Sequence, residues 1–147
     1  MQKKTSLEVR ISEVARHYIG IPYKFGSDPN EVGAADNSHL LCSIYEQAAE
    51  QAGLRFAGYM PMRILMRNIV AVRQDYIRNG DLMVLNDGHA AMIYNVEGPE
   101  NFDLIYASLK RQEVISFNSR NVVFDAYWLK NLRGYYRVSE QLFSRMD

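Results

Sequence analysis

Two stretches near the amino terminus repeat apolar residues at the spacing of an amphipathic helix. The first runs from Ser6 to about Tyr18 and ends before Gly20. The second follows a segment rich in turn residues and closes at Gly53. Its apolar stripe consists of Leu40, Leu41, Ile44, Tyr45, Ala48 and Ala52. The pattern therefore predicts two helices in the first part of the chain.

From Gly80 onward the pattern changes to short runs of β-prone residues separated by turn sequences such as NDG and EGPEN. The runs span residues 81–85, 89–96, 102–109 and 113–117. They predict an antiparallel meander. A helical turn is expected over residues 125–132 and a last strand over 134–138.

The segment between Gly53 and Gly80 is harder to interpret. It predicts a short helix after Pro61, but its apolar residues fit neither the helical nor the strand period. The chain has 147 residues, near the usual size of one domain, and no linker, repeat or low-complexity run divides it. Helices followed by a meander predict a single α+β domain over residues 1–147.

The charge balance excludes some classes of partner. Lysine plus arginine and aspartate plus glutamate both total 17, and no basic run interleaves with aromatic residues, so we expect no nucleic acid partner. No stretch approaches the ~20 apolar residues of a membrane span. The amphipathic start does not read as an export signal, which favours a cytoplasmic chain, although a chain trimmed of its signal and exported would look the same.

The numbers and spacing of the cysteine and histidine residues limit which disulfides and metal sites the chain can form. A single cysteine, Cys42, excludes an internal disulfide. The three histidines share no metal-ligand spacing with one another or with Cys42. We therefore expect no metal and no cofactor.

A candidate nucleophile position lies at the start of the second predicted helix, in the stretch GAADNSHLLCSIYEQA. A helix amino terminus presents unpaired N–H groups and a partial positive charge, which lower the pKa of a thiol and stabilise an oxyanion. Cysteine hydrolases place the nucleophile there and take a base from a rigid neighbouring element. His89 meets that requirement because it opens a predicted strand directly after NDG.

Five short motifs follow one another between Ile19 and Val138. They read IGIPYKFGS, ADNSHLLCSIYEQAAEQAGL, NGDLMVLNDGHAAMIYN, LIYAS and RGYYRV. Their order and spacing resemble the NlpC-type family of bacterial cell-wall cysteine peptidases. The resemblance implies a papain-like fold, in which a helix bearing the cysteine packs against an antiparallel sheet bearing the histidine. It also implies that an intact relative hydrolyses an amide bond in a peptidoglycan stem peptide.

The resemblance assigns the site residue by residue. The family's cysteine aligns with Asn37, so the thiol is absent. The family's histidine falls on His89, and its third polar residue, often His, Asn or Gln, falls on Tyr106. The tyrosine of the family's Pro-Tyr element is Tyr23. Asn37 and Tyr106 are therefore two departures from the family's pattern.

The residues around Asn37 also have plainer interpretations. Asparagine is a good N-cap residue, so Asn37 fits a helix cap as well as a lost nucleophile. Ser38 lies about 100° further round the helix than Asn37, so the two side chains point in different directions. Asp36 is suited to stabilise the loop or to interact with the helix dipole. His39 fits a residue at the rim of a cleft. Cys42, more than a turn into the helix, fits a buried inert thiol.

We therefore expect the cleft without the chemistry: an inactive NlpC-type domain that binds a peptidoglycan stem peptide or other peptide. The expected binding residues are Tyr23, Asp36, Ser38 and His39. They lie beside the three positions that the resemblance assigns to catalysis, which here hold Asn37, His89 and Tyr106. One alternative is an active cell-wall peptidase whose cysteine was mutated to Asn37, although one mutation does not explain Tyr106. A second alternative is an intracellular interaction module. The sequence gives no indication of the oligomeric state.

Overall fold

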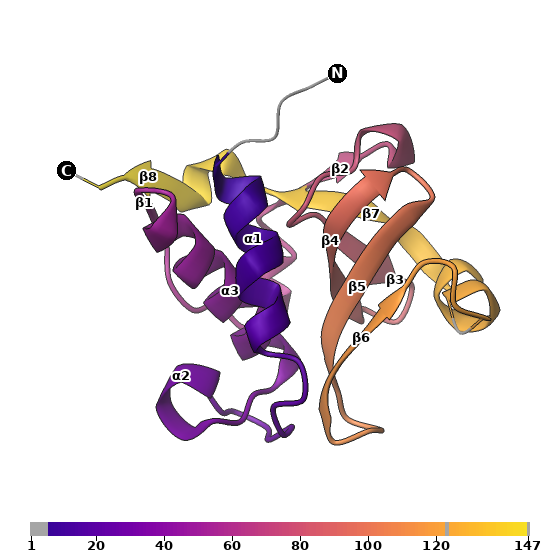
Figure 1. The fold of residues 1–147 in the computed structure, drawn as a ribbon, viewed down its shortest axis with the longest axis horizontal. Helices are drawn as coiled ribbons and strands as arrows, with labels where there is room; N and C mark the ends of the chain where they lie inside the picture. Colours follow the sequence, from indigo (N-terminus) through magenta and orange to yellow (C-terminus); the bar gives the residue numbers. More distant parts are fainter. Residues whose placement is uncertain (1–5, 123, 147) are drawn as a thin grey trace.

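Two long helices lie side by side and cover one face of an antiparallel sheet (Figure 1). They are α1 (Ser6–His17) and α3 (Asn37–Gln51), as the apolar stripes predict. The computed structural model describes residues 6–122 and 124–146. The arrangement is the predicted α+β class, with the helical layer on one side and the sheet on the other.

Helix α3 is the central element of the core. Its predicted stripe is fully buried from Leu40 to Ala48, because the helix packs against α1 on one side and the sheet on another. The helix ends at Gln51, and Gly53 follows it with a left-handed backbone, φ 77°. Glycine adopts that conformation without the cost a Cβ would impose.

The main sheet has six strands in the order β2-β7-β3-β4-β5-β6. Its strands are β2 (Ile69–Val72), β3 (Leu82–Leu85), β4 (Ala90–Gly98), β5 (Asn101–Ser108), β6 (Glu113–Asn118) and β7 (Leu132–Val138). Strands β3 to β6 form the predicted meander. The last strand of the sheet, β7, returns to pair with both β2 and β3.

The remaining elements are short. They are α2 (Pro29–Val32), β1 (Leu54–Phe56), α4 (Met62–Leu65), η1 (Gln74–Tyr76), the π-helical η2 (Phe124–Leu129), η3 (Glu140–Leu142) and β8 (Phe143–Arg145). The short helix after Pro61 and the helical turn near residue 125 were predicted. Strands β1, β2 and β8 were not, because three or four residues are too few to establish a period.

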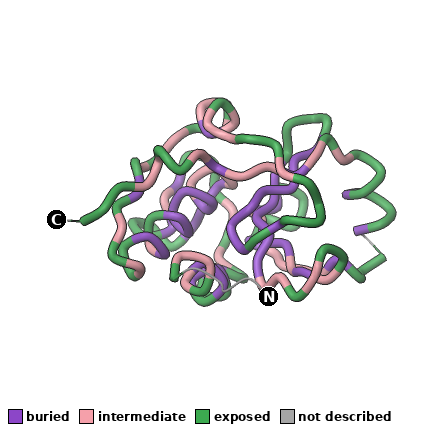
Figure 2. Tube along the Cα trace, turned by 90° about the horizontal axis from the view of Figure 1, so that it is seen from above, coloured by how far each residue is buried: buried purple, intermediate pink, exposed green. Residues whose placement is uncertain are grey.

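The two faces of the sheet pack against different partners. On β4, Ala90, Met92 and Tyr94 join the core beneath α1 and α3, whereas Ala91 and Ile93 join a second core with Trp128 on η2. Figure 2 shows the buried residues gathered in the interior and the exposed ones along the outer loops. Among the described residues, no helix has the length and apolar character needed to cross a membrane.

An ion pair joins the buried carboxylate of Asp81, directly before β3, to Arg137 on β7. The Asp81 carboxylate accepts hydrogen bonds from Arg137 Nε at 2.8 Å and Nη2 at 2.9 Å, and from the Arg78 N–H at 2.7 Å. The Asp81 side chain is only 2% exposed. Burial raises the pKa of Asp81, and the bonds from Arg137 and Arg78 oppose that shift. The pair holds the carboxylate in the interior.

Replacing Arg137 with alanine should destabilise the fold. The change leaves the Asp81 carboxylate buried without its charged partner, at an expected cost of about 3 kcal/mol in the free energy of unfolding. Urea denaturation measures the loss. Arg133→Ala is the matched control, because Arg133 is exposed on the same strand and only covers the Tyr136 ring; it should cost less than about 1 kcal/mol. Equal losses for the two variants would contradict the role given to Arg137.

Candidate functional site

The start of α3 is organised by Asp36, the N-cap residue. Its carboxylate accepts the His39 N–H at 3.0 Å and the Gly26 N–H at 2.8 Å, so it joins the preceding loop to the helix. The sequence placed the cap at Asn37, which is wrong by one residue. Asp36 has an extended backbone, φ −94° and ψ 177°, whereas Asn37 is already the first helical residue.

Asp36 also fixes the imidazole of His39. Its Oδ1 lies 2.7 Å from His39 Nδ1, and the same oxygen lies 3.2 Å from Ser38 Oγ. Burial pushes the pKa of Asp36 upward, but the hydrogen bonds from His39 and Gly26 outweigh it, so the pKa lies below its usual value. The carboxylate is therefore charged at neutral pH, and it holds three neighbouring groups at the helix start.

The Asn37 side chain points into the sheet and makes two hydrogen bonds there. Its Nδ2 donates to Ala90 O at 2.8 Å, and its Oδ1 accepts the Ala107 N–H at 2.9 Å. Strands β4 and β5 pair at Met92 and Ile105, and the same register continued by two residues places Ala90 opposite Ala107. The carboxamide thus bridges the two strands where a direct ladder bond would otherwise lie.

The chemistry of the bridge requires an amide side chain. A carboxamide carries both a donor and an acceptor, like the peptide group that it replaces in the ladder. A cysteine thiol is a weak donor and a weak acceptor, and an aspartate would place a second acceptor against Ala90 O. Asn37 is therefore matched to a structural task at this position.

His89 lies directly before β4, but its imidazole contacts Asp87. Nδ1 lies 2.8 Å from Asp87 Oδ2, and the His89 side chain is 71% exposed. No hydrogen bond between the side chains of His89 and Asn37 occurs among the described residues. On β4 the residues that face α3 begin with Ala90, and neighbouring positions of a strand point to opposite faces. Asn37 thus bonds the main chain of Ala90 beside His89, while the exposed imidazole of His89 bonds Asp87 instead of Asn37.

Tyr106 faces the opposite side of the sheet from Asn37. Its ring packs on Trp128, with centroids 5.0 Å apart, and lies edge-on to Phe117 at 6.2 Å. Burial raises the pKa of its hydroxyl. The position of β5 that faces Asn37 is Ala107, one residue further along. Asn37, Ala90 and Ala107 are thus the groups that meet, and none of them titrates.

An aromatic side chain that the sequence did not single out completes the helix start. The Tyr59 ring stacks on His39, with centroids 3.8 Å apart and planes at 11°, and its hydroxyl lies 3.0 Å from Ser38 Oγ. Tyr59 lies in the segment whose pattern fits neither period, so no local signal marked it. Tyr23 is half-buried against the core, with its N–H donated to Gln112 O at 2.9 Å.

Comparison with solved structures identifies the architecture. A lipoprotein-like protein of the NLP/P60 family from Staphylococcus aureus matches 95% of this chain with a TM-score of 0.66 and 19% identity. NlpC1 and NlpC2 from Trichomonas vaginalis match 99% and 98% of it, with TM-scores of 0.58 and 0.57 and identities of 16% and 15%. The chain has an NlpC/P60-like fold.

The chain spans only part of these structures, covering 44%, 47% and 50% of their lengths. No protein-family model matches its sequence, and no curated protein matches it at a significant level. In the part of the NlpC/P60-like domain that the structure describes, no group of three His, Cys, Asp or Glu side chains is placed to hold a metal ion.

Cys42 lies inside the NlpC/P60-like core. It is 2% exposed, and its thiol donates to Met60 O at 3.6 Å. Burial raises its pKa to about 11. The thiol on the second turn of α3 is therefore neutral and enclosed, as expected for a buried cysteine.

Truncating Asn37 should cost stability because it removes both hydrogen bonds to the sheet. Asn37→Ala leaves the Ala90 carbonyl and the Ala107 N–H without their partner, and we expect a loss of about 1–3 kcal/mol in the free energy of unfolding. Chemical denaturation measures it. Glu50→Ala is the control on the exposed face of the same helix and should change stability by less than about 0.5 kcal/mol. An unchanged midpoint for Asn37→Ala would show that the bridge contributes nothing.

The single thiol offers a second test of the same helix. At pH 8 the Cys42 thiol should react with an aromatic disulfide reagent far more slowly in the folded protein than in urea, because burial keeps it protonated and enclosed. Absorbance of the released thiolate follows the reaction. Equal rates in the two states would mean that α3 does not bury this residue.

Proposed function

We propose that this chain is a non-hydrolytic binding domain that holds a peptide or muropeptide over the start of α3. The single observation that carries the proposal is the pair of hydrogen bonds from the Asn37 carboxamide to Ala90 O and the Ala107 N–H. This side chain is engaged in joining helix to sheet, and alanine occupies the two facing positions. Asn37 and the two alanines that face it offer neither a nucleophile nor a base, and loss of such groups lowers hydrolysis by several orders of magnitude.

The surface over the helix start favours recognition of a peptide. The stacked rings of His39 and Tyr59 are held in place, since Asp36 fixes the imidazole and Ser38 bonds the phenol hydroxyl. Tyr59 is 46% exposed, so part of its ring remains available to a ligand. Phe25, adjacent to the Gly26 that Asp36 holds, is 86% exposed. Aromatic faces beside polar groups suit the side chains and amides of a peptide.

The geometry also bears on the alternative of an active peptidase mutated at Asn37. A substitution made only to remove a thiol would not be expected to complete a ladder between two strands. The positions that face Asn37 would still hold Ala90 and Ala107, while the imidazole of His89 bonds Asp87. These observations favour asparagine as the native residue. The binding experiment tests the other alternative, an interaction module without a cell-wall ligand.

The test is a titration of the ¹⁵N-labelled chain with a disaccharide tetrapeptide and, separately, with the tetrapeptide alone. We expect binding to shift the amide signals of Ser38, His39 and Tyr59, with no cleavage product by mass spectrometry. Tyr59→Ala should weaken binding about tenfold because it removes the stacked face. Tyr76→Ala, which truncates another exposed tyrosine on η1, should leave the affinity unchanged.

Asn37→Cys separates the proposal from the enzyme alternative. We expect no turnover of the muropeptide, because the restored thiol would still lack an imidazole partner. Turnover that disappears in the further variant His89→Ala would overturn the proposal in favour of a mutated peptidase. Absence of binding by the unmodified chain to either ligand would overturn it in favour of an interaction module.

A further inference from the structure

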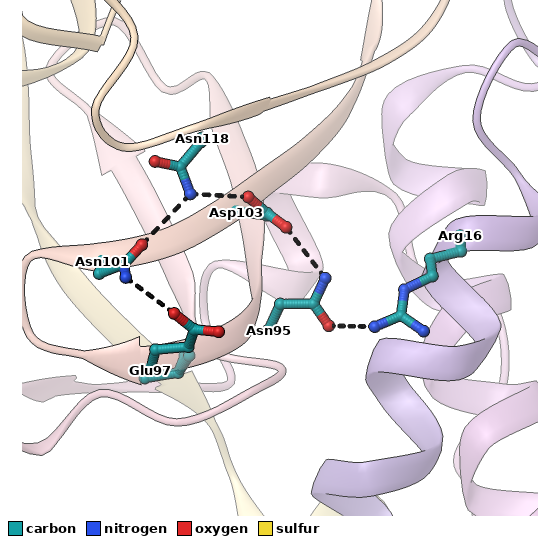
Figure 3. A pocket seen from close by; sticks show the side chains of 7 residues that line it. Arg16, Asn95, Glu97, Asn101, Asp103 and Asn118 are labelled. Carbon is teal, nitrogen blue, oxygen red and sulfur yellow. Dashed lines mark hydrogen bonds between the residues drawn. The ribbon is translucent and has the colours of Figure 1, made fainter.

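A cavity of about 310 Å³ lies between the carboxyl end of α1 and strands β4 to β6 (Figure 3). It is lined by Arg16, Asn95, Val96, Glu97, Asn101, Asp103 and Asn118. Asn37 contacts the first residue of β4, whereas the cavity is lined by Asn95, Val96 and Glu97 near the end of that strand. The cavity is therefore separate from the start of α3.

A bulge in β4 builds one wall of this cavity. Tyr94 pairs with Asp103 and Gly98 with Asn101, so three residues of β4 oppose the single Phe102 of β5. At the bulge Asn95 takes a left-handed backbone, φ 50°, and its N–H is donated to Ser12 Oγ on α1 at 3.0 Å. This conformation places its side chain on the helix side of the sheet, within reach of both α1 and β5.

All the lining side chains except that of Val96 form one continuous hydrogen-bonded row with opposite charges at its ends (Figure 3). Arg16 Nη2 donates to Asn95 Oδ1 at 2.7 Å, and Asn95 Nδ2 donates to Asp103 Oδ2 at 2.9 Å. Beyond Asp103 the row continues through the carboxamides of Asn118 and Asn101. It ends at the Glu97 carboxylate, which accepts Asn101 Nδ2 at 2.9 Å.

The row leaves its charged groups without an ion-pair partner. Arg16, Asp103 and Glu97 take part in none of the salt bridges of the described residues. Their formal charges are one positive and two negative, and the Asn95 carboxamide separates the cation from the nearer carboxylate. A guanidinium binds a carboxylate through paired N–H groups, and a carboxylate binds an ammonium through charge-assisted hydrogen bonds. The cavity therefore offers complementary sites for the two ends of a zwitterion.

We propose that this cavity is a binding site for a free basic amino acid, whose α-carboxylate meets Arg16, whose α-ammonium meets Asp103, the nearer carboxylate of the row, and whose side-chain ammonium meets Glu97 at its far end. Its volume is at the lower end of the range of small-molecule sites, which suits a ligand of that size. The excess of one negative charge favours a basic amino acid over a neutral one. The site is independent of peptide binding at the start of α3.

Titration of the ¹⁵N-labelled protein with L-lysine tests the proposal. Saturable shifts should appear at the amide signals of Asn95, Asn101 and Asn118 below roughly 10 mM ligand, a concentration that would detect even weak binding. L-Alanine should bind more weakly. Lysine methyl ester, which lacks the carboxylate, and Nα-acetyl-lysine, which lacks the α-ammonium, should each lose about tenfold in affinity. Glucose, a neutral polar probe of similar size, should cause no shift at these residues.

Single-residue variants assign the two ends of the ligand. Arg16→Gln should weaken L-lysine binding about tenfold but leave the residual affinity of the methyl ester unchanged, and Glu97→Gln should weaken both. Arg10→Gln on α1, whose side chain is 43% exposed, and Glu100→Gln at an exposed position in the hairpin after β4 are charge-matched controls and should bind as the unmodified chain does. Asn95→Gly removes the carboxamide while glycine accepts the left-handed backbone, so it should weaken binding without loss of the fold.

The proposal is overturned if L-lysine causes no saturable shift, or if the controls lose as much affinity as Arg16→Gln and Glu97→Gln. It is also overturned if glucose shifts the same signals, since the cavity would then recognise polar groups without regard to charge. Retention of amino-acid binding alongside failure of the muropeptide titration would support this site while overturning the proposed function.

Discussion

The Asn37 carboxamide joins the first turn of α3 to the place where β4 and β5 separate. The helix layer and the sheet layer meet there through two hydrogen bonds to main-chain groups, which hold both position and direction more tightly than apolar contact alone. Asp36, one residue earlier, fastens the preceding loop to the same turn. Two neighbouring side chains thus hold the helix, the loop and the sheet around one point.

At the position where the family resemblance implies a nucleophile, this NlpC/P60-like fold has Asn37, whose side chain joins the helix to the sheet. A nucleophile must be free to approach a substrate, whereas the Asn37 side chain has both its polar atoms engaged. The remaining polar groups of the helix start, on Ser38, His39 and Tyr59, bond one another or Asp36. These mutual bonds hold the polar groups of the helix start in a fixed arrangement.

The alternation of side chains along β4 and β5 explains how the sheet serves different purposes on its two faces. Along each strand, one set of alternate residues packs beneath the helices, and the other set packs on Trp128 and its aromatic neighbours. Only at the bulge does the alternation fail, and there Asn95 turns toward α1. The same strand therefore contacts the start of α3 at its first residue and lines a polar cavity near its end.

The sequence by itself determined the two long helices, the meander of β3 to β6 and the α+β class, because their apolar periods extend over enough residues to be unambiguous. It also marked the start of α3 and the strand that begins beside His89. Only the tertiary structure decided which residues meet there. A shift of one residue in a strand turns a side chain to the other face, so Ala90 and Ala107 face Asn37 where the motifs had indicated His89 and Tyr106. The contacts of Tyr59 and the bulge at Asn95 arise between segments distant in the chain, and no local pattern of residues encodes them.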